Sequence, residues 1–328
     1  MNERGDEMAN IALLNRCNLR CPYCFADGYL SSEKDDISVA RFEELLDFCA
    51  PDGSLGIIGG EPLLHPLFDR LMDIVKDDYR FGKITVFTNG IFIEKHLSAF
   101  LDGRLSLLIN LNSPSDIGAT NFERVEKGIS LLEENGVLPF VTVGINVYME
   151  NQDFSHQLRI IEKFGFNRVR LSVVIPQDKK AGGIPYFIKM KPTLLGLYSE
   201  LARLGVSPCY DCNAIPECVF DEREKRLLSS LPFSNSFERE IFMGQRSVCS
   251  PVIDIYPDKT ATRCFGCYDM CRVSIDEFES IGDLRNYFFK EIDARLVHNY
   301  ASPKCAGCYK NKVFGCFGGC LCYLEENT

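Results

Sequence analysis

The chain has 328 residues, and its hydrophobic content of 46% and charged content of 25% are those of a globular protein with one or two domains. Its net charge of −10 argues against a nucleic-acid partner, which would need phosphate neutralisation. No apolar run approaches the ~20 residues that span a bilayer, and the polar N-terminus lacks an export signal. We therefore expect a cytoplasmic protein with no membrane partner.

The first half of the chain alternates β-rich runs with helical patterns. Strands are predicted at residues 10–14, 55–60, 83–88, 105–111, 140–147 and 168–175, and helices at 37–50, 65–77, 93–101, 121–135 and 153–164. This alternation predicts a parallel sheet covered by helices, either an open doubly wound sheet or a barrel. His96 and His156 fall in predicted helices, and we expect both to be solvated.

The pattern changes after residue 176. A loop is followed by a helix expected at 193–204, and from residue 205 the alternation stops and cysteines become frequent. The sequence thus predicts two domains, residues 1–200 and a smaller cysteine-rich domain at 201–328.

The loop after the first predicted strand contains Cys17, Cys21 and Cys24, spaced C-x3-C-x2-C. Three thiolates suit three irons of a four-iron, four-sulfur cluster and leave the fourth iron open to a substrate or cofactor. The alternative is half of a zinc site. Zinc sites usually pair two such knuckles, and no second one follows within a hundred residues.

This motif, with aromatic Tyr23 before its last cysteine, resembles the radical S-adenosylmethionine (SAM) enzymes. The resemblance implies a partial (β/α)6 TIM-like barrel and a catalytic [4Fe-4S] cluster on the three cysteines. It also implies that the open iron chelates the amine and carboxylate of SAM, which is cleaved reductively to a 5′-deoxyadenosyl radical. Tyr23 matches a position that packs near the adenine.

Further candidate contacts to SAM follow the strands. Gly59, Gly60 and Glu61 match the family's GGE motif, which holds the methionine amine. Polar residues at or near later strand ends are candidates for the ribose hydroxyls and the carboxylate, because polar residues in a barrel strand favour the lumen; they could equally be capping or turn residues. These residues are Asn89, Asn110, Asn112, Asn146, Arg170 and Ser172.

Twelve of the 16 cysteines fall in the last 120 residues. The pattern Cys249-x14-Cys264 followed by Cys305-x2-Cys308-x7-Cys316-x3-Cys320 resembles the SPASM extension of radical SAM enzymes, which carries one or two auxiliary [4Fe-4S] clusters. Two departures are a spacing of seven where five is usual, and the lack of a final cysteine before the chain ends at Thr328.

The cysteines allow more than one ligand partition. One consistent partition gives Cys212, Cys218, Cys249 and Cys264 to one cluster and Cys305, Cys308, Cys316 and Cys320 to the other. A crossed arrangement is as consistent, and a zinc ribbon on the last four is a further alternative. Cys209, Cys267, Cys271 and Cys322 are spare thiols that could complete a cluster, and Cys267 or Cys271 could donate a hydrogen atom.

The resemblance favours an oxidoreductase that matures a peptide or protein by thioether formation, carbon–carbon crosslinking or epimerisation. A flavodoxin- or ferredoxin-type protein would supply the electron. The alternatives are modification of a small molecule such as a sugar, and a zinc-stabilised binding module without enzymatic activity.

Overall fold

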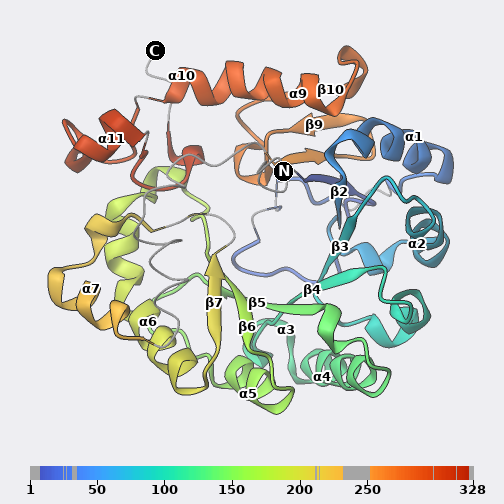
Figure 1. Ribbon diagram of the computed structural model, residues 1–328, viewed down its shortest axis with the longest axis horizontal. Helices are drawn as coiled ribbons and strands as arrows, with labels where there is room; N and C mark the ends of the chain where they lie inside the picture. Colours follow the sequence, from blue (N-terminus) through green and yellow to red (C-terminus); the bar gives the residue numbers. More distant parts are fainter. Residues whose placement is uncertain are drawn as a thin grey trace. The chain divides into compact units, whose positions relative to one another are not determined.

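Figure 1 draws the computed structural model with colours that follow the sequence. The structure describes most of the chain. The described residues are 8–24, 26, 28–31, 35–210, 213, 215–231, 252–297, 299–314 and 316–324.

Packing divides the chain into two compact units, each of which combines distant segments. The first unit comprises Met1–Asn110, Pro114–Thr142 and Ser250–Phe289. The second comprises Leu111–Ser113, Val143–Cys249 and Lys290–Thr328. The domain boundary predicted near residue 200 separates the barrel from the cysteine-rich extension, which is a different division from these two packing units. That boundary stays a prediction.

The sheet of the first unit has the order β10-β9-β8-β1-β2-β3-β4. Strands β8, β1, β2, β3 and β4 are parallel, whereas β9 and β10 are added antiparallel. The strands are β1 (Ala9–Ala12), β2 (Ser54–Ile58), β3 (Lys83–Thr88), β4 (Ser106–Asn110), β8 (Ile253–Ile255), β9 (Thr260–Thr262) and β10 (Arg272–Ser274).

Helices lie outside β1–β4, as Figure 1 shows for α1, α2 and α4. Helix α1 begins after Ser38, whose hydroxyl accepts a hydrogen bond from the Arg41 N–H at 3.2 Å. The α-helices of this unit are α1 (Val39–Cys49), α2 (Phe68–Lys76), α3 (Pro114–Ile117), α4 (Ala119–Glu134) and α9 (Ile281–Phe288). Its 3-10 helices are η1 (Ala50–Asp52), η2 (Pro62–Leu64), η3 (Ile93–Phe100), η4 (Leu138–Phe140), η8 (Phe265–Cys267) and η9 (Ile275–Glu277).

The strands of the first unit have one apolar and one more polar face. Ile11, Leu55 and Ile84 share the apolar face and are completely or almost completely buried. The pairing register puts Asn10 beside Gly56 on the opposite face, and it pairs Asn10 with Asp254 of β8. The Asn10 amide donates a hydrogen bond of 2.6 Å to the Asp254 carboxylate, which is 1% exposed.

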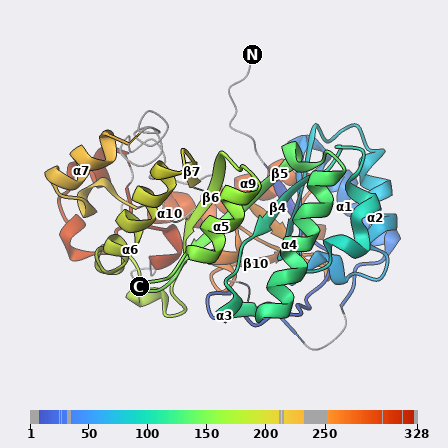
Figure 2. The same cartoon turned by 90° about the horizontal axis from the view of Figure 1, so that it is seen from below.

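The second unit contains the parallel strands β5, β6 and β7. Figure 2 shows α5 in front of β6. The strands are β5 (Val141–Val147, its first two residues in the first unit), β6 (Arg168–Val173) and β7 (Ser207–Tyr210). The helices are α5 (Ser155–Lys163), η5 (Lys179–Ala181), α6 (Ile184–Arg203), η6 (Glu217–Val219), α7 (Glu222–Ser229), the π-helix η10 (Phe289–Asp293), α10 (Ala294–Leu296), η11 (Pro303–Cys305), α11 (Tyr309–Phe314) and η12 (Leu321–Tyr323).

The predicted α/β architecture with parallel strands is confirmed, but some local expectations are wrong. The helix expected at 193–204 begins at Ile184, because Pro192 is accommodated inside α6 and Pro185 occupies its first turn. Strand β7 was not predicted, although it follows α6 directly. Among the described residues, no helix is long and apolar enough to cross a membrane.

His96 is not the solvated residue that we expected. The chain kinks at His96 within η3, and its side chain is buried at 3% exposure. Its Nδ1 lies 2.7 Å from the Asp69 carboxylate and its Nε2 lies 3.0 Å from the Leu63 carbonyl oxygen. His156 is exposed as expected.

The Asp254 contact tests how much β8 contributes to stability. We expect Asp254→Ala to lower the free energy of unfolding by about 2–3 kcal/mol, because it leaves the Asn10 amide in the interior without this acceptor. The matched control is Glu94→Ala, which removes an ion pair to Lys127 whose side chains are more than half exposed. That change should cost less than about 1 kcal/mol. Urea unfolding measures both, and equal losses would contradict the assignment.

Candidate active site

The loop after β1 presents three cysteines, Cys17, Cys21 and Cys24, all partly exposed. The Arg20 guanidinium donates to the carbonyl oxygens of Cys17 and Leu19 at 3.1 and 2.9 Å. A turn is closed by the Cys24 N–H, which donates to the Cys21 carbonyl oxygen at 3.1 Å. The loop is thus held by contacts within itself, and its sulfurs remain partly accessible.

The three thiols lie close enough to influence one another. Burial, with smaller effects from the neighbouring Glu61 and Cys24, raises the pKa of Cys17 to about 11. Burial, with smaller effects from the charges of Cys17 and Cys24, also raises the pKa of Cys21 to about 12. Crowded thiols resist ionisation until a metal compensates their charge, so this donor set fits a cluster that binds thiolates.

Polar groups also surround the sulfurs. The Leu19 N–H donates to Cys17 Sγ at 3.4 Å, and the Tyr23 side chain hydrogen-bonds to Cys21. Hydrogen bonds to sulfur tune the potential of an iron–sulfur cluster. Tyr23 therefore contacts the cysteine loop itself.

The Gly59-Gly60-Glu61 turn after β2 packs directly against the chain leading into this loop. The N–H groups of Gly60 and Glu61 donate to the carbonyl oxygens of Leu14 and Arg16 at 3.0 and 2.8 Å. A Cβ placed on Gly60 would lie 2.0 Å from the Arg16 carbonyl oxygen. Only glycine allows the two backbones to approach so closely.

Glu61 is the buried carboxylate of the site, at 1% exposure. It accepts hydrogen bonds from the Thr88 hydroxyl at 2.7 Å, the Asn89 N–H at 2.7 Å and the Leu63 N–H at 3.1 Å. These bonds favour the carboxylate, but burial outweighs them and raises the pKa of Glu61 to about 7.

Asn89 connects this carboxylate to the cysteine loop. Its amide nitrogen donates to the Asn18 side-chain oxygen at 2.9 Å, and its own side-chain oxygen accepts from the Ile91 N–H at 3.1 Å. Glu61, Asn89 and Asn18 therefore join the ends of β2 and β3 to the loop. Sequence reasoning singled out Asn89 as a ligand contact and missed this bracing role and its partner Asn18.

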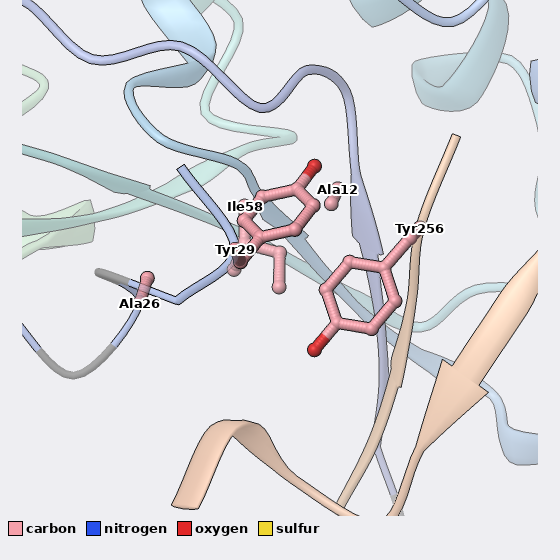
Figure 3. Close-up of a cluster of buried hydrophobic side chains, with 5 residues drawn as sticks. All are labelled: Ala12, Ala26, Tyr29, Ile58 and Tyr256. Atoms are coloured by element: carbon pink, nitrogen blue, oxygen red, sulfur yellow. The ribbon is translucent and has the colours of Figure 1, made fainter. Parts of the chain in front are cut away.

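An aromatic cluster supports the other end of the loop. Figure 3 shows Tyr29 from the loop region facing Tyr256, which follows β8. Their ring centroids are 4.6 Å apart, and Ala12, Ala26 and Ile58 complete the buried cluster. Cys24, Phe265 and Tyr268 pack against it. Residues near 260 thus help to position Cys24, which the sequence did not predict.

The remaining candidates lie on strands or their ends. Asn110 ends β4 and Asn112 is buried. In the second unit, Asn146 pairs with Ser172, and Arg170 pairs with both Gly144 and Cys209. Paired residues share a face, and the alternating Val143, Ile145, Val169 and Leu171 are buried on the other. Asn146, Arg170 and Ser172 therefore lie together on the polar face.

The later cysteines fall into separate groups. In the second unit, Lys310 joins the segments of Cys218 and Cys316, because its side chain pairs with Glu217 and its carbonyl oxygen accepts from the Cys316 N–H. Burial raises the pKa of Cys218, and Cys316 and Cys308 add smaller effects in the same direction. Burial also raises the pKa of Cys305, with smaller effects from Cys218, Cys316 and Cys308. This grouping corresponds to a crossed ligand arrangement. Cys320 lies beside Tyr323 and Cys322.

The first unit holds Cys264, where a hydrogen bond from Cys267 lowers the pKa to about 6. Cys212 and Cys249 lie outside the described residues. No disulfide joins the described cysteines, and in that part of the chain no three His, Cys, Asp or Glu side chains converge on a single-ion site.

Comparison with known proteins agrees with this geometry. The model of the radical SAM superfamily matches residues 11–164, which include the cysteine loop and the Gly-Gly-Glu turn. Residues 11–164 are therefore a radical SAM domain. Members of this family use a [4Fe-4S] cluster and SAM.

Two groups of curated relatives match at the sequence level. A protein named GTP 3′,8-cyclase from Chlorobaculum tepidum is 29% identical over 152 residues, covering 44% of this chain and 46% of the relative. AlbA, a subtilosin biosynthesis protein of Bacillus subtilis, is 29% identical over 165 residues, covering 46% of this chain and 35% of the relative. The chain thus spans about half or less of these relatives.

Solved structures match nearly the whole chain. SuiB of Streptococcus suis, bound to SAM, is similar with a TM-score of 0.62 and 17% identity, covering 96% of this chain and 72% of SuiB. The enzyme anSMEcpe, bound to AdoMet and a peptide, has a TM-score of 0.65 and 17% identity, covering 95% and 88%. At this identity the likeness shows the fold, which is the radical SAM partial barrel.

The close approach at Gly60 gives a stability test. We expect Gly60→Ala to destabilise the protein by more than about 3 kcal/mol, because its methyl group would overlap the Arg16 carbonyl. Gly196→Ala in α6 is the matched control, since beyond its chain neighbours and its own helix backbone no atom lies within 4 Å of the added Cβ. Alanine favours a helix interior, so the control should be neutral or slightly stabilising. Urea unfolding would measure the stability of both variants, and similar midpoints for the two would refute the close approach of Gly60 to the Arg16 carbonyl.

Burial of Glu61 predicts a pH dependence. The unfolded chain loses this proton near pH 4.5 and the folded chain near pH 7. Protonated Glu61 therefore contributes about 3 kcal/mol to the free energy of unfolding. This contribution is fully present below pH 4.5 and is lost as the pH rises through 7. In Glu61→Gln the free energy of unfolding should be lower at acidic pH but flatter across this window. Parallel curves for the two proteins would contradict the prediction.

Proposed function

We propose that this protein cleaves SAM reductively and abstracts a hydrogen atom from a peptide or protein substrate. Family membership and the cysteine loop beside the Gly-Gly-Glu turn support the first step. The single observation that carries the proposal is the backbone contact of Gly60 and Glu61 with the residues that lead into Cys17.

Cys17, Cys21 and Cys24 would each bind one iron of a [4Fe-4S] cluster. When bound, such a cluster supplies the electron that breaks a carbon–sulfur bond of SAM, giving methionine and a 5′-deoxyadenosyl radical. The chain provides three thiolates and no fourth from this loop, which keeps one iron available. The Leu19 N–H and Tyr23 stabilise the charge on the sulfurs.

Gly59, Gly60 and Glu61 would hold the methionine amine. An ionised carboxylate accepts about four hydrogen bonds. Protein donors occupy both sites on Glu61 Oε1 and one on Oε2. One acceptor position is thus left for an ammonium group, whose charge would also favour ionisation of the buried acid.

Asn110, Asn112, Asn146, Arg170 and Ser172 stay predictions for the ribose and the carboxylate of SAM. Tyr23 stays a prediction for the adenine, and Asn89 is proposed to act by positioning Asn18 and the turn after β3. Auxiliary [4Fe-4S] clusters in residues 201–328 and a flavodoxin- or ferredoxin-type donor complete the proposal, with the cytoplasm as the location.

The peptide substrate is supported by two structural neighbours that were solved with peptides. SuiB has been solved with the precursor peptide SuiA, and anSMEcpe with a peptide named Kp18Cys. Each covers at least 95% of this chain. The relative AlbA also carries the name of a bacteriocin biosynthesis protein.

A small-molecule substrate is the second candidate. Several curated relatives are named GTP 3′,8-cyclase. Anaerobic incubation with GTP, or with short peptides encoded beside the gene, would distinguish the two. A mass change in a peptide that depends on SAM supports the proposal, whereas conversion of GTP alone would replace it.

Cleavage of SAM itself can be tested without a substrate. We expect reconstituted protein to form 5′-deoxyadenosine with dithionite, and Cys17→Ala, Cys21→Ala and Cys24→Ala each to reduce it to background. Cys49→Ala is the control, because Cys49 is buried in α1 away from the loop. A protein that contains zinc instead of iron, or makes no 5′-deoxyadenosine, would refute the enzymatic proposal.

A further inference from the structure

Four cysteines of the second unit gather at one place although the sequence separates them widely. Cys218 lies in η6, Cys305 ends η11, and Cys308 and Cys316 stand just before and after α11. Cys218 lies near Cys308 and Cys316, and Cys305 lies near all three others.

Lys310 fixes this arrangement from both sides. Its ammonium group forms an ion pair with Glu217, the residue before Cys218. Its carbonyl oxygen accepts a hydrogen bond of 3.2 Å from the Cys316 N–H. A second cation, Lys225, lies 3.4 Å from the Glu217 carboxylate. The segments that carry Cys218 and Cys316 are therefore joined through one residue of α11.

Most of the segment between Cys308 and Cys316 forms the helix α11. The Asn311 amide donates to the carbonyl oxygens of Cys316 and Asn299 at 2.9 and 3.0 Å, which turns the chain back after the helix. The Cys308 N–H donates to the Cys305 carbonyl oxygen at 3.0 Å. The seven-residue spacing thus remains compatible with three sulfurs at one site.

The four sulfurs differ in how far the surrounding chain covers them. A Cβ on Gly318 would lie only 2.7 Å from Cys305 Sγ, and Gly318 has a φ of +80°. Cys218 is the one exposed cysteine of this group. A ligand set with one exposed thiol (Cys218), two half-buried thiols (Cys308 and Cys316) and one buried thiol (Cys305) fits a cluster near the surface.

We propose that Cys218 is the fourth ligand of an auxiliary [4Fe-4S] cluster whose other ligands are Cys305, Cys308 and Cys316. This inference rests on the proposed function, because the iron chemistry comes from the family. Four thiolates occupy every iron, so this cluster would transfer electrons and not bind a substrate. Cys320, which spacing grouped with the last three, is left outside this set.

The test uses a background in which Cys17, Cys21 and Cys24 are replaced by alanine, so that only auxiliary clusters remain. After anaerobic reconstitution, Cys218→Ala should lower iron and sulfide by about four each per chain. Cys49→Ala in the same background should lose neither. Cys218→Ser should retain part of the iron with altered g values of the reduced cluster, a signature that a purely structural role would not produce.

Alkylation of the unsubstituted, reconstituted protein provides a second measurement that needs no variant. We expect iodoacetamide to modify Cys218 only after a chelator has removed the iron, as mass spectrometry of its peptide would show. Modification of Cys218 in the loaded protein, unchanged iron in Cys218→Ala, or zinc retained at this site would each overturn the proposal. Failure of the proposed function would appear separately, as absent 5′-deoxyadenosine with the auxiliary iron intact.

Discussion

The site depends on a backbone contact between the ends of two neighbouring strands. Gly60 and Glu61 hydrogen-bond to the carbonyl oxygens of Leu14 and Arg16, immediately before Cys17. Because the strands are parallel, both ends reach the same edge of the sheet. The contact fixes the cysteine loop relative to the end of β2. It requires glycine at residue 60, because a Cβ there would overlap a backbone oxygen.

Glu61 extends this constraint to a third strand. Its carboxylate binds the Thr88 hydroxyl and the Asn89 N–H, and Asn89 in turn holds Asn18 of the loop. A buried acid that satisfies donors from two segments resists movement of either one, since separation would leave it in the interior without partners. The loop is thus braced by a closed hydrogen-bond network and not only by its own turns.

Local patterns predicted the elements whose signals are local. Strand β3 begins and ends at the expected residues, and α1 (Val39–Cys49) lies within the helix expected at 37–50, because the periodicity that predicts each element lies within its own residues. The inward turn of His96 depends on Asp69 and Leu63, and the packing of Tyr29 depends on Tyr256, more than two hundred residues away. Likewise, the spacing of the late cysteines could not place Cys218 beside Cys316, since the Glu217–Lys310 ion pair that joins their segments has no local signature.

The candidate active site brings together acidic groups, the cysteine thiols and Glu61, whose ionisation is opposed by burial. Glu61 lies close enough to Cys17 to raise the pKa of its thiol, and the three thiols act on one another in the same direction. Protons hold such a site neutral until cations replace them. The irons of a cluster and the ammonium group of SAM would supply this charge at the two places where the chain presents it, the sulfurs and the remaining lone pair of Glu61. The same burial that makes the acids weak would make each cation bind strongly, because little water screens the attraction.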